Sequence, residues 1–493
     1  MKKILTSKEM KMADESTIKK HGIPSMVLME RAALACVDEI GTVFNDGPFV
    51  MLCGVGNNGA DGVAIARLCR LKNQDVSVYI CGDESRYTAE LKQQIEIAKS
   101  YDVLFCKSLK ELPDNPAVIV DALFGIGLSR EVTGEYAKAI QWINQSKSYV
   151  VSVDMPSGYC ADTGRELGVG VHADVTVTFS YKKRGQLLGK CKAEGCGRLV
   201  VADAGIYCED DVTCFEAMPE DVQIALPPRK KDANKGSCGK LLVIAGSQDI
   251  YGACYLCAHA AMVTGAGLVK VYTHVNNTDV LKDKLPEAIT VGYKEFDRIQ
   301  LKEMLDWADV VLIGPGISCC DISWAMVDFV MNNYTGPVIA DADALTILAE
   351  NKSLIANKNC SLIITPHMKE MSRLCGLTIA DINEDMVKAA TYYAREYDCI
   401  IILKNHCTVI GTPSGKCYIN TTGNEGMATA GSGDVLSGIV ASLLAQKMET
   451  EASAYVGAML HGTAGDIAAL NNGKRGMMAS DIVTGIKQFL KDY

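Results

Sequence analysis

Short hydrophobic runs alternate with longer amphipathic stretches through the first part of the chain. Runs rich in Val and Ile occupy residues 49–53, 76–81, 118–121, 149–154 and 175–179. The stretches between them are long enough to hold a helix that crosses back over a sheet. Nearly continuous apolar runs of this kind are typical of parallel strands buried on both faces. The pattern predicts an α/β domain with a Rossmann-like three-layer sandwich.

A second series of apolar runs begins after residue 239. Its members are 240–245, 268–272, 310–313, 338–340, 362–364 and 400–403. Two Pro-containing segments and the charge run Arg229–Asp232 separate the two series, as expected of a boundary. We therefore predict an N-terminal domain at 1–212, a connector at 213–228 and a second three-layer α/β domain at 229–493. Their motifs show no convincing internal repeat.

Composition restricts the possible partners. The 493 residues are 48% hydrophobic and carry a formal charge of -10, with no basic block longer than Arg229–Lys231. Both domains are large enough to form a core without disulfides or structural metal. The charge argues against nucleic acid or an anionic membrane as the main partner. A small anionic ligand remains compatible with it.

The N-terminal segment and the cysteines predict a cytoplasmic location. Only Ile4 and Leu5 are apolar before polar residues resume, so no signal-peptide core is expected, and no apolar run approaches the ~18 residues of a membrane span. The 20 cysteines should be free thiols in a reducing compartment. Cys254 and Cys257 form a Cys-x-x-Cys near His259, but the small residues around them favour a packed helix over a metal site.

The most informative string in the second domain contains Gly431-Ser432-Gly433-Asp434 and opens an apolar helical pattern that runs to Leu444. Closely spaced glycines let backbone N–H groups converge on an anion, and the helix dipole favours negative charge there. Asp434 could simply cap the helix. The glycine spacing instead favours a phosphate site in which Asp434 accepts a proton from a substrate hydroxyl during phosphate transfer.

Four other polar segments follow predicted strands of the same domain. They are Gly314-Pro315-Gly316, Asp341-Ala342-Asp343, Thr365-Pro366-His367 and Lys404. Because ligands of open parallel sheets bind outside the carboxyl ends of the strands, these segments should converge on one crevice. Each is a weak signal alone: a Gly-Pro-Gly is commonly a turn, and a lysine at a strand end is commonly solvated.

Residues 234–486 resemble the ADP/ATP-dependent NAD(P)H-hydrate dehydratases, a branch of the ribokinase-like superfamily. The resemblance runs through Asn234-Lys235-Gly236, Gly239-Lys240, Ala245-Gly246-Ser247, Gly252-Ala253, Gly265-Ala266-Gly267, Gly314-Pro315-Gly316, Asp341 to Leu345, Thr365-Pro366-His367, Glu370 and Gly431 to Asp434. It implies a ribokinase-like α/β/α domain. It also implies nucleotide contacts from Lys404, Asn405, His406, Cys407, Thr408, Gly431, Ser432 and Gly433, and hydrate contacts from Ala253, Gly316, His367 and Asp434.

The chain departs from that family at three positions. Asn405 and Ser318 stand where Gly is usual, and Ser432 replaces Thr. Since Asn tolerates a left-handed backbone nearly as well as Gly, we expect the Lys404 loop to be intact.

A second glycine-rich loop, Gly54–Gly62, follows the first predicted strand of the N-terminal domain. A strand-to-helix turn of this kind is a weak indication of an anion site. Asp121 and Asp154 close two further strands of the same sheet. Either carboxylate could cap the next element, but three polar loops on one edge favour a site.

Residues 1 to about 212 resemble the NAD(P)H-hydrate epimerases. The resemblance runs through Gly22–Ser25, Leu28–Ala32, the Asn57-Asn58 loop, Asp121–Gly127, Val153–Gly158, Asp162–Gly164 and Ala173–Phe179. It implies K⁺ ligation by Asn58, Asp121 and Ser157, with Asp154 as the catalytic base. It further implies substrate contacts from Asn57, Asn58, Gly59, Ala60, Asp61, Gly125, Ile126, Gly127, Leu128, Ser129, Arg130, Glu131, Tyr136 and Asp154. Ala60 replaces a common Gly, and we expect it to leave the N–H donors of the loop in place.

Together the resemblances imply a bifunctional repair enzyme for hydrated NADH and NADPH. The N-terminal domain would epimerise the R and S hydrates, and the C-terminal domain would dehydrate the S form with ADP as co-substrate and Mg²⁺ accompanying the nucleotide. A homo-oligomer is expected. One alternative is a ribokinase-like small-molecule kinase, because the Gly-x-Gly-Asp helix start serves kinases equally well. Another makes the N-terminal half a non-catalytic binding module.

Overall fold

The chain folds as two compact units. The computed structural model describes residues 1–44, 46–209, 212–226, 228–229 and 231–492. One unit comprises Lys3–Val212, and the other comprises Thr213–Tyr493 with Met1–Lys2. Within the described residues, no helix combines the length and the apolar character needed to cross a membrane.

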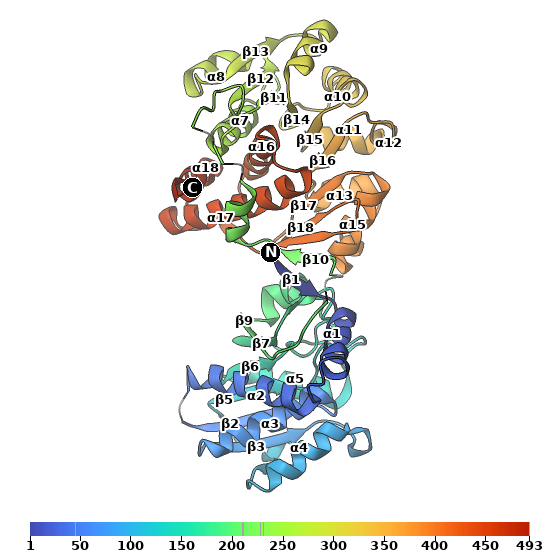
Figure 1. Cartoon of the computed structure of the whole chain (residues 1–493), viewed down its shortest axis with the longest axis vertical. Helices are drawn as coiled ribbons and strands as arrows, with labels where there is room; N and C mark the ends of the chain where they lie inside the picture. Colours follow the sequence, from blue (N-terminus) through green and yellow to red (C-terminus); the bar gives the residue numbers. More distant parts are fainter. Residues whose placement is uncertain (45, 210–211, 227, 230, 493) are drawn as a thin grey trace. The chain divides into compact units, whose positions relative to one another are not determined.

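The N-terminal unit is built on a seven-stranded sheet in the order β4-β3-β2-β5-β6-β7-β9, with every neighbouring pair parallel (Figure 1). The strands are β2 (Pro48–Cys53), β3 (Asp75–Ile80), β4 (Leu104–Cys106), β5 (Val118–Ala122), β6 (Tyr149–Val153), β7 (Val175–Phe179) and β9 (Arg198–Ala202). A short parallel pair, β1 (Lys2–Leu5) with β8 (Lys182–Lys183), lies outside this sheet. The predicted α/β three-layer sandwich is confirmed.

Helices cover both faces of this sheet because alternate residues of each strand point to opposite sides. Phe49, Met51 and Cys53 of β2 pack with α2 (Ser25–Gly41), α3 (Asn57–Leu71) and α4 (Ala89–Lys99). Val50 and Leu52 pack with α5 (Gly134–Gln145) on the other face. The remaining helix, α1 (Ser7–Lys19), begins with a capping box between Thr6 and Glu9.

The C-terminal unit has strands in the order β13-β12-β11-β14-β15-β16-β17-β18-β19-β10. They are β10 (Cys214–Glu216), β11 (Lys240–Ile244), β12 (Leu268–His274), β13 (Ile289–Tyr293), β14 (Val310–Ile313), β15 (Pro337–Ala340), β16 (Ser361–Ile364), β17 (Ile400–Leu403), β18 (Thr408–Gly411) and β19 (Cys417–Asn420). Pairing is parallel from β13 to β17 and antiparallel through β18 and β19.

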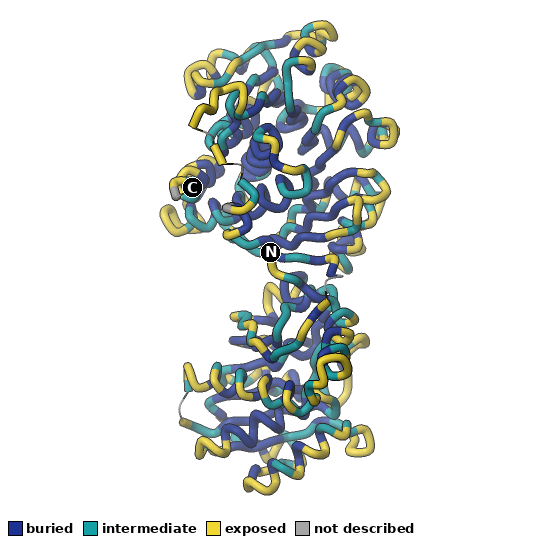
Figure 2. The backbone as a smooth tube through the Cα atoms, viewed as in Figure 1, coloured by how far each residue is buried: buried dark blue, intermediate teal, exposed yellow. Residues whose placement is uncertain are grey.

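Two helical layers enclose that sheet. On one face lie α7 (Gly252–Thr264), α16 (Ser432–Ala445), α17 (Thr450–Asn472) and α18 (Ala479–Phe489), whose apolar residues share one core with β11 and β12. The other helices are α8 (Thr278–Lys284), α9 (Arg298–Trp307), α10 (Asp321–Asn333), α11 (Asp343–Glu350), α12 (Ser353–Ala356), α13 (Met368–Cys375), α14 (Ile379–Glu384) and α15 (Met386–Glu396). The central strands are buried and the outer helix faces are exposed (Figure 2).

Segment 213–228, expected to be a connector, is largely structured. Its β10 pairs with β19, and its α6 (Pro219–Ala225) packs against α17. The Pro residues that suggested a linker include Pro219 at the first turn of α6, a position where the missing N–H of proline costs nothing. This segment therefore belongs to the C-terminal unit.

Candidate active sites

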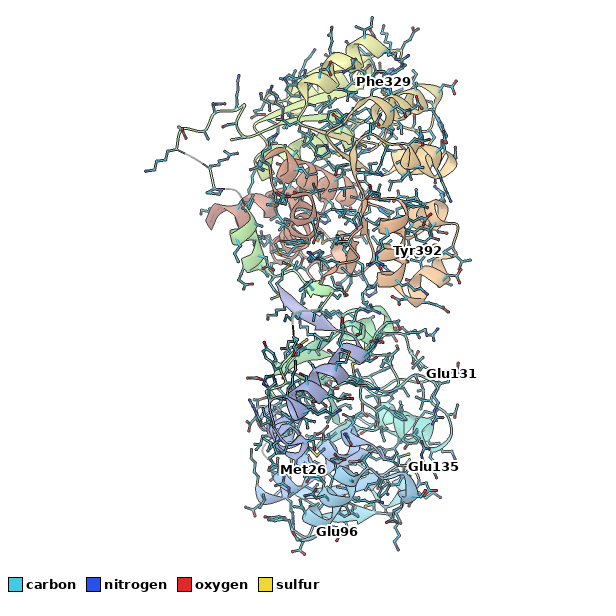
Figure 3. The ribbon with its side chains drawn as sticks, turned by 45° about the vertical axis from the view of Figure 1, so that its right-hand side comes forward. Met26, Glu96, Glu131, Glu135, Phe329 and Tyr392 are labelled. Carbon is cyan, nitrogen blue, oxygen red and sulfur yellow. The ribbon has the colours of Figure 1, made fainter. Side chains whose placement is uncertain are left out.

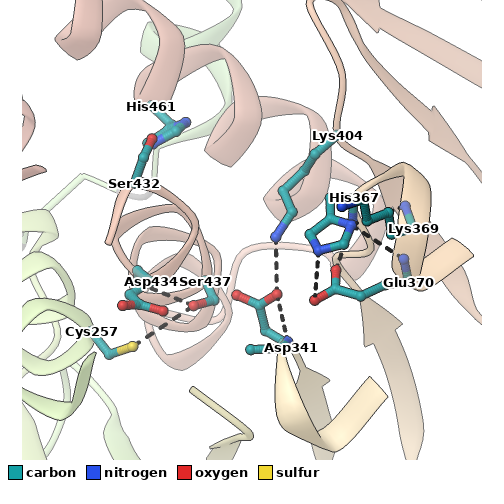
Figure 4. A network of polar contacts seen from close by, with 11 residues as sticks. Cys257, Asp341, His367, Lys369, Glu370, Lys404, Ser432, Asp434, Ser437 and His461 are labelled. Atoms are coloured by element: carbon teal, nitrogen blue, oxygen red, sulfur yellow. Dashed lines mark hydrogen bonds and ion pairs between the residues drawn. The ribbon is translucent and has the colours of Figure 1, made fainter. Parts of the chain in front are cut away.

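Three strand ends of the C-terminal unit meet in one polar network. The Nζ atom of Lys404, just after β17, lies 3.0 Å from Oδ1 of Asp341, just after β15 (Figure 4). His367, after β16, forms an isolated parallel bridge with Lys404. The structure thus brings together the loops that the sequence placed at the carboxyl edge of the sheet.

Lys404 is charged in spite of its surroundings. Burial opposes the ammonium, but the carboxylates of Asp341, Glu370 and Asp434 outweigh burial and raise the pKa of Lys404. Desolvation raises the pKa of Glu370 to about 7, although Lys404 acts in the opposite direction. The result is a compact cluster of one lysine and several carboxylates, with Asp341 fully buried.

His367 is held in one orientation by the start of α13. Its Nδ1 accepts hydrogen bonds from the N–H groups of Lys369 and Glu370 at 3.0 and 3.2 Å. The proton of the neutral ring therefore sits on Nε2, which lies 3.4 Å from Oε1 of Glu370. Burial, followed by the charge of Lys404, lowers the pKa of His367.

Asp434 lies in the first turn of α16 and does not cap the helix. The N-cap is Gly431, at φ 89°, and it makes no side-chain capping bond. Burial, reinforced by the negative charge of Asp341, raises the pKa of Asp434 to about 6, against the opposing effect of Lys404. A carboxyl group with such a pKa can accept and release a proton near neutral pH.

The glycine loop before α16 leaves an anion-sized space beside Lys404. The N–H groups of Gly433 and Asp434 have no hydrogen-bond partner among the described residues. A Cβ atom at Gly433 would lie 3.1 Å from Nζ of Lys404 and 3.9 Å from Oδ2 of Asp341. Free N–H donors, the helix dipole and an ammonium in one place suit a phosphate group.

The remaining residues expected at this site fall into two groups. Ala253 and Gly316 are neighbours, since a Cβ at Gly316 would lie 3.0 Å from that of Ala253. Asn405 and His406 are exposed, whereas the Cys407 side chain is buried, so only its backbone can meet a ligand. The side chain of Thr408 is half-buried at the start of β18.

Ser318, and not Asn405, has a positive φ near this site. Ser318 has φ 62°, and its N–H donates to Oδ2 of Asp343 at 2.8 Å. Asn405 does not have a positive φ, so the loop after Lys404 does not depend on the ability of Asn to adopt a left-handed backbone. Its Oδ1 instead accepts a hydrogen bond from the His406 N–H at 2.9 Å.

Sequence reasoning missed His461, which lies on α17. Its Nε2 is 3.3 Å from Oγ of Ser432 in the glycine loop. Burial lowers the pKa of His461 to about 4. No motif surrounds this histidine in the sequence, and only the packing of α17 against α16 brings it to the loop.

The N-terminal unit contains a cavity of about 620 Å³ at the carboxyl edge of its sheet. Eleven of the residues expected to contact substrate line it: Asn57, Asn58, Asp61, Gly125, Ile126, Gly127, Leu128, Ser129, Arg130, Tyr136 and Asp154. Glu131 is exposed (Figure 3). Gly59 and Ala60 are buried, and none of these three residues lines the cavity. Lys11 and Asp14 of α1 line the cavity without having been predicted.

The start of α3 presents N–H donors to this cavity. The N–H groups of Asn57, Asn58 and Gly59 have no hydrogen-bond partner in the described part of the chain. The Ala60 N–H is not an additional free donor, because it donates to the Gly56 carbonyl at 3.1 Å. The helix therefore offers a smaller anion site than its glycine-rich sequence suggested.

Asp154 lines the same cavity. It has φ 66°, and its Oδ1 forms an ion pair with Nζ of Lys183. The Lys183 side chain is 0% exposed, which places a charged group in the interior with this carboxylate as its partner. Burial and then the charge of Asp154 raise the pKa of Asp61, which faces the same cavity.

The three residues expected to hold K⁺ have compatible chemistry. Asp121 is fully buried, and its carboxylate accepts hydrogen bonds from Ser152 and Ser157 at 2.6 to 2.8 Å. No ion pair compensates its charge within the described residues. The buried amide of Asn58 has an Nδ2 atom without a partner, so its orientation is not fixed by other groups. A monovalent cation with oxygen ligands fits this set.

Comparison with known proteins places both units in families. A family model described as NAD(P)H-hydrate dehydratase matches residues 241–488, and one described as the YjeF-related protein N-terminus matches residues 25–185. A crystal structure of a ribokinase-like superfamily protein from Enterococcus faecalis is 28% identical, with a TM-score of 0.51. It covers 58% of this chain, and 98% of its own chain is matched. The C-terminal unit is thus a ribokinase-like α/β/α domain.

Two curated relatives match nearly the whole chain. Bifunctional NAD(P)H-hydrate repair enzymes from Moorella thermoacetica and Thermofilum pendens are 36% and 34% identical. Each match covers 99% of this chain, and 97% and 96% of the two relatives. The chain belongs to the family of bifunctional NAD(P)H-hydrate repair enzymes.

Proposed function

We propose that this protein restores hydrated NADH and NADPH to NADH and NADPH. The N-terminal unit interconverts the R and S hydrates, and the C-terminal unit dehydrates the S hydrate while ADP is cleaved to AMP and phosphate. The observation that carries the C-terminal assignment is the position of the Asp434 carboxyl beside the free N–H groups of α16. Family membership supports both activities.

In the C-terminal site, Asp434 accepts the proton of the hydroxyl on C6 of the nicotinamide ring. The hydroxyl oxygen then bonds to the terminal phosphorus of ADP as the bond from that phosphorus to AMP breaks. In the second step the C6–O bond breaks, phosphate leaves, and loss of a proton from C5 forms the ring double bond. The ammonium of Lys404 and the N–H groups of Gly433 and Asp434 stabilise the charge on the moving phosphate.

The nucleotide contacts proposed for this site are Lys404, Asn405, His406, Cys407, Thr408, Gly431, Ser432 and Gly433. The hydrate would lie against Ala253, Gly316 and His367, with its C6 hydroxyl at Asp434. Mg²⁺ would enter with the nucleotide phosphates, since the described residues contain no cluster of three or more His, Cys, Asp or Glu side chains suited to a metal.

In the N-terminal cavity, Asp154 acts as the base, and the free N–H groups at the start of α3 hold a phosphate of the hydrate. Asn58, Asp121 and Ser157 would hold K⁺, which would compensate the buried Asp121 charge beside the substrate. The conversion needs no oxidant or reductant, because the R and S hydrates differ only in configuration at C6.

The test measures recovery of dihydronicotinamide absorbance from a mixture of R and S hydrates with ADP or ATP. Wild type should recover all of the absorbance, Asp154→Ala only the S fraction, and Asp434→Ala none. Faster recovery with ADP than with ATP would support ADP as the co-substrate. A stable phosphorylated product with no recovery would overturn the proposal in favour of a small-molecule kinase.

A further inference from the structure

Two residues of the turn after β7 contact Asp154, one at its side chain and the other at its backbone carbonyl. Lys183, at the end of β8, forms the ion pair with Oδ1 of the Asp154 side chain. Gln186, in the following 3₁₀ turn Arg184–Leu187, donates from Nε2 to the Asp154 carbonyl oxygen at 2.6 Å. The Lys183 N–H in turn donates to Oε1 of Gln186 at 2.7 Å, which fixes the orientation of the amide. We call Lys183 and Gln186 the Asp154 clamp.

The clamp holds Asp154 in a conformation that it would not adopt freely. A left-handed backbone is unfavourable for a non-glycine residue, although Asp tolerates it better than most. The Asp154 N–H donates to the Val177 carbonyl at 2.8 Å, so both backbone polar groups are engaged. The direction of the carboxylate is therefore set by residues of β7 and of the turn after it.

Lys183 is also the cation that balances a group of acidic residues. Asp14 from α1 and Asp61 from α3 line the same cavity as Asp154. Burial, and next the charge of Asp154, raise the pKa of both Asp14 and Asp61, whereas Lys183 lowers that of Asp14. The Nζ of Lys183 also donates to Oγ1 of Thr178 at 2.8 Å, and Thr178 donates to Asp154. Without Lys183, three carboxylates would face one another in a half-buried space.

We propose that Lys183 and Gln186 are positioning residues of the epimerase, which compensate the charge of the Asp154 carboxylate and aim it into the cavity. This inference rests on the proposed function of the N-terminal unit. The substrate need not touch either residue, because Lys183 is fully buried and Gln186 acts on the Asp154 backbone. Their effect should therefore fall on the rate of the chemical step rather than on binding.

The experiment measures R-to-S conversion as the extra absorbance recovered by the full-length enzyme from R hydrate, over a range of substrate concentrations. Lys183→Met should lower kcat by roughly 100-fold with KM nearly unchanged, the scale of a lost acid–base contribution. Lys183→Arg should restore part of kcat, because it returns a cation to Asp154. Gln186→Met should lower kcat with KM nearly unchanged.

Two internal controls separate the possible failures. Lys192→Met, which changes an exposed lysine of the same unit, should behave as wild type. Dehydration of S hydrate by the other unit of the same molecule shows that the coupling step of the assay is intact in each variant. If wild type shows no R-to-S conversion, the proposed epimerase function fails.

If wild type converts the R hydrate and Asp154→Ala does not, the clamp is tested directly. A wild-type kcat in Lys183→Met would overturn the inference. Should Lys183→Met fail to fold, Gln186→Met decides: reduced kcat with unchanged KM supports the clamp, and an unchanged kcat overturns it.

Discussion

The Lys404 ammonium and the Asp341 carboxylate meet 3.0 Å apart, although the strands that carry them are not neighbours. The strand between them in the sheet is β16, so the pair spans its carboxyl end. Lys404 is thereby held beside the glycine loop, where a Cβ at Gly433 would lie 3.1 Å from its Nζ. The pair links the sheet to the phosphate site.

Replacing only one partner of this ion pair should lower the stability of the C-terminal unit. Lys404→Met leaves the buried Asp341 carboxylate without its closest cation, and such losses typically cost about 3 kcal/mol. The double variant Asp341→Asn, Lys404→Met should recover most of that stability but not dehydration. Denaturant unfolding followed by tryptophan fluorescence in a Trp142→Phe background reports on the C-terminal unit, which keeps Trp307 and Trp324. Additive effects in this double-mutant cycle would show that the pair contributes no coupling.

The two glycines of the loop should respond in opposite ways to alanine. Gly433→Ala lies within α16, where alanine favours the helix by about 1 kcal/mol, yet its Cβ would enter the space proposed for phosphate. We expect unchanged or higher stability with dehydration reduced at least roughly tenfold. Gly431→Ala must adopt φ 89° and place a Cβ 2.3 Å from Leu256, so it should lower stability as well. Thermal unfolding and S-hydrate turnover distinguish the two effects.

Much of this arrangement was predictable because it is encoded locally. The apolar runs predicted the central strands of both units, and the glycine spacing predicted the start of α16 with Asp434 in its first turn. The β18–β19 hairpin was missed, since its short strands lack a continuous apolar run. Lys183 and His461 were missed for a different reason: each lies 29 residues from its partner, and only tertiary packing brings the pairs together. The sequence near Glu131 likewise gave no sign that this side chain points to solvent.

The pH dependence of dehydration should follow Asp434. Its ionised form is the base, and its pKa is raised to about 6, so kcat/KM for S hydrate should fall as the pH decreases through 6. Lys404 lowers this pKa, and Lys404→Met should therefore move the acid limb to higher pH in whatever activity remains. An acid limb that stays near pH 4 in the wild type would contradict the assignment.

The raised pKa of Asp434 also predicts a stability effect. The folded state binds the proton more tightly than the unfolded state, so ionised Asp434 destabilises the fold above about pH 6. Asp434→Asn should raise stability at pH 8 by about 1 kcal/mol after solvent screening, and the difference should shrink as the pH falls through 6. Unfolding of both proteins at several pH values measures it. Equal stability at every pH would show that the carboxylate is well solvated.

His461 should make the protein less stable as the pH falls, whereas Asp434 makes it less stable as the pH rises. Burial lowers its pKa to about 4, so between the ordinary value near 6.5 and about 4 the unfolded state binds a proton that the folded state does not. Stability from this residue is complete above pH 6.5 and declines as the pH falls below it, by about 1–2 kcal/mol at pH 5. His461→Gln keeps a hydrogen-bonding side chain near Ser432 and should remove this decline. His172→Gln, at an exposed position of the other unit, should leave the decline as it is, and a decline that persists in His461→Gln would assign it to another group.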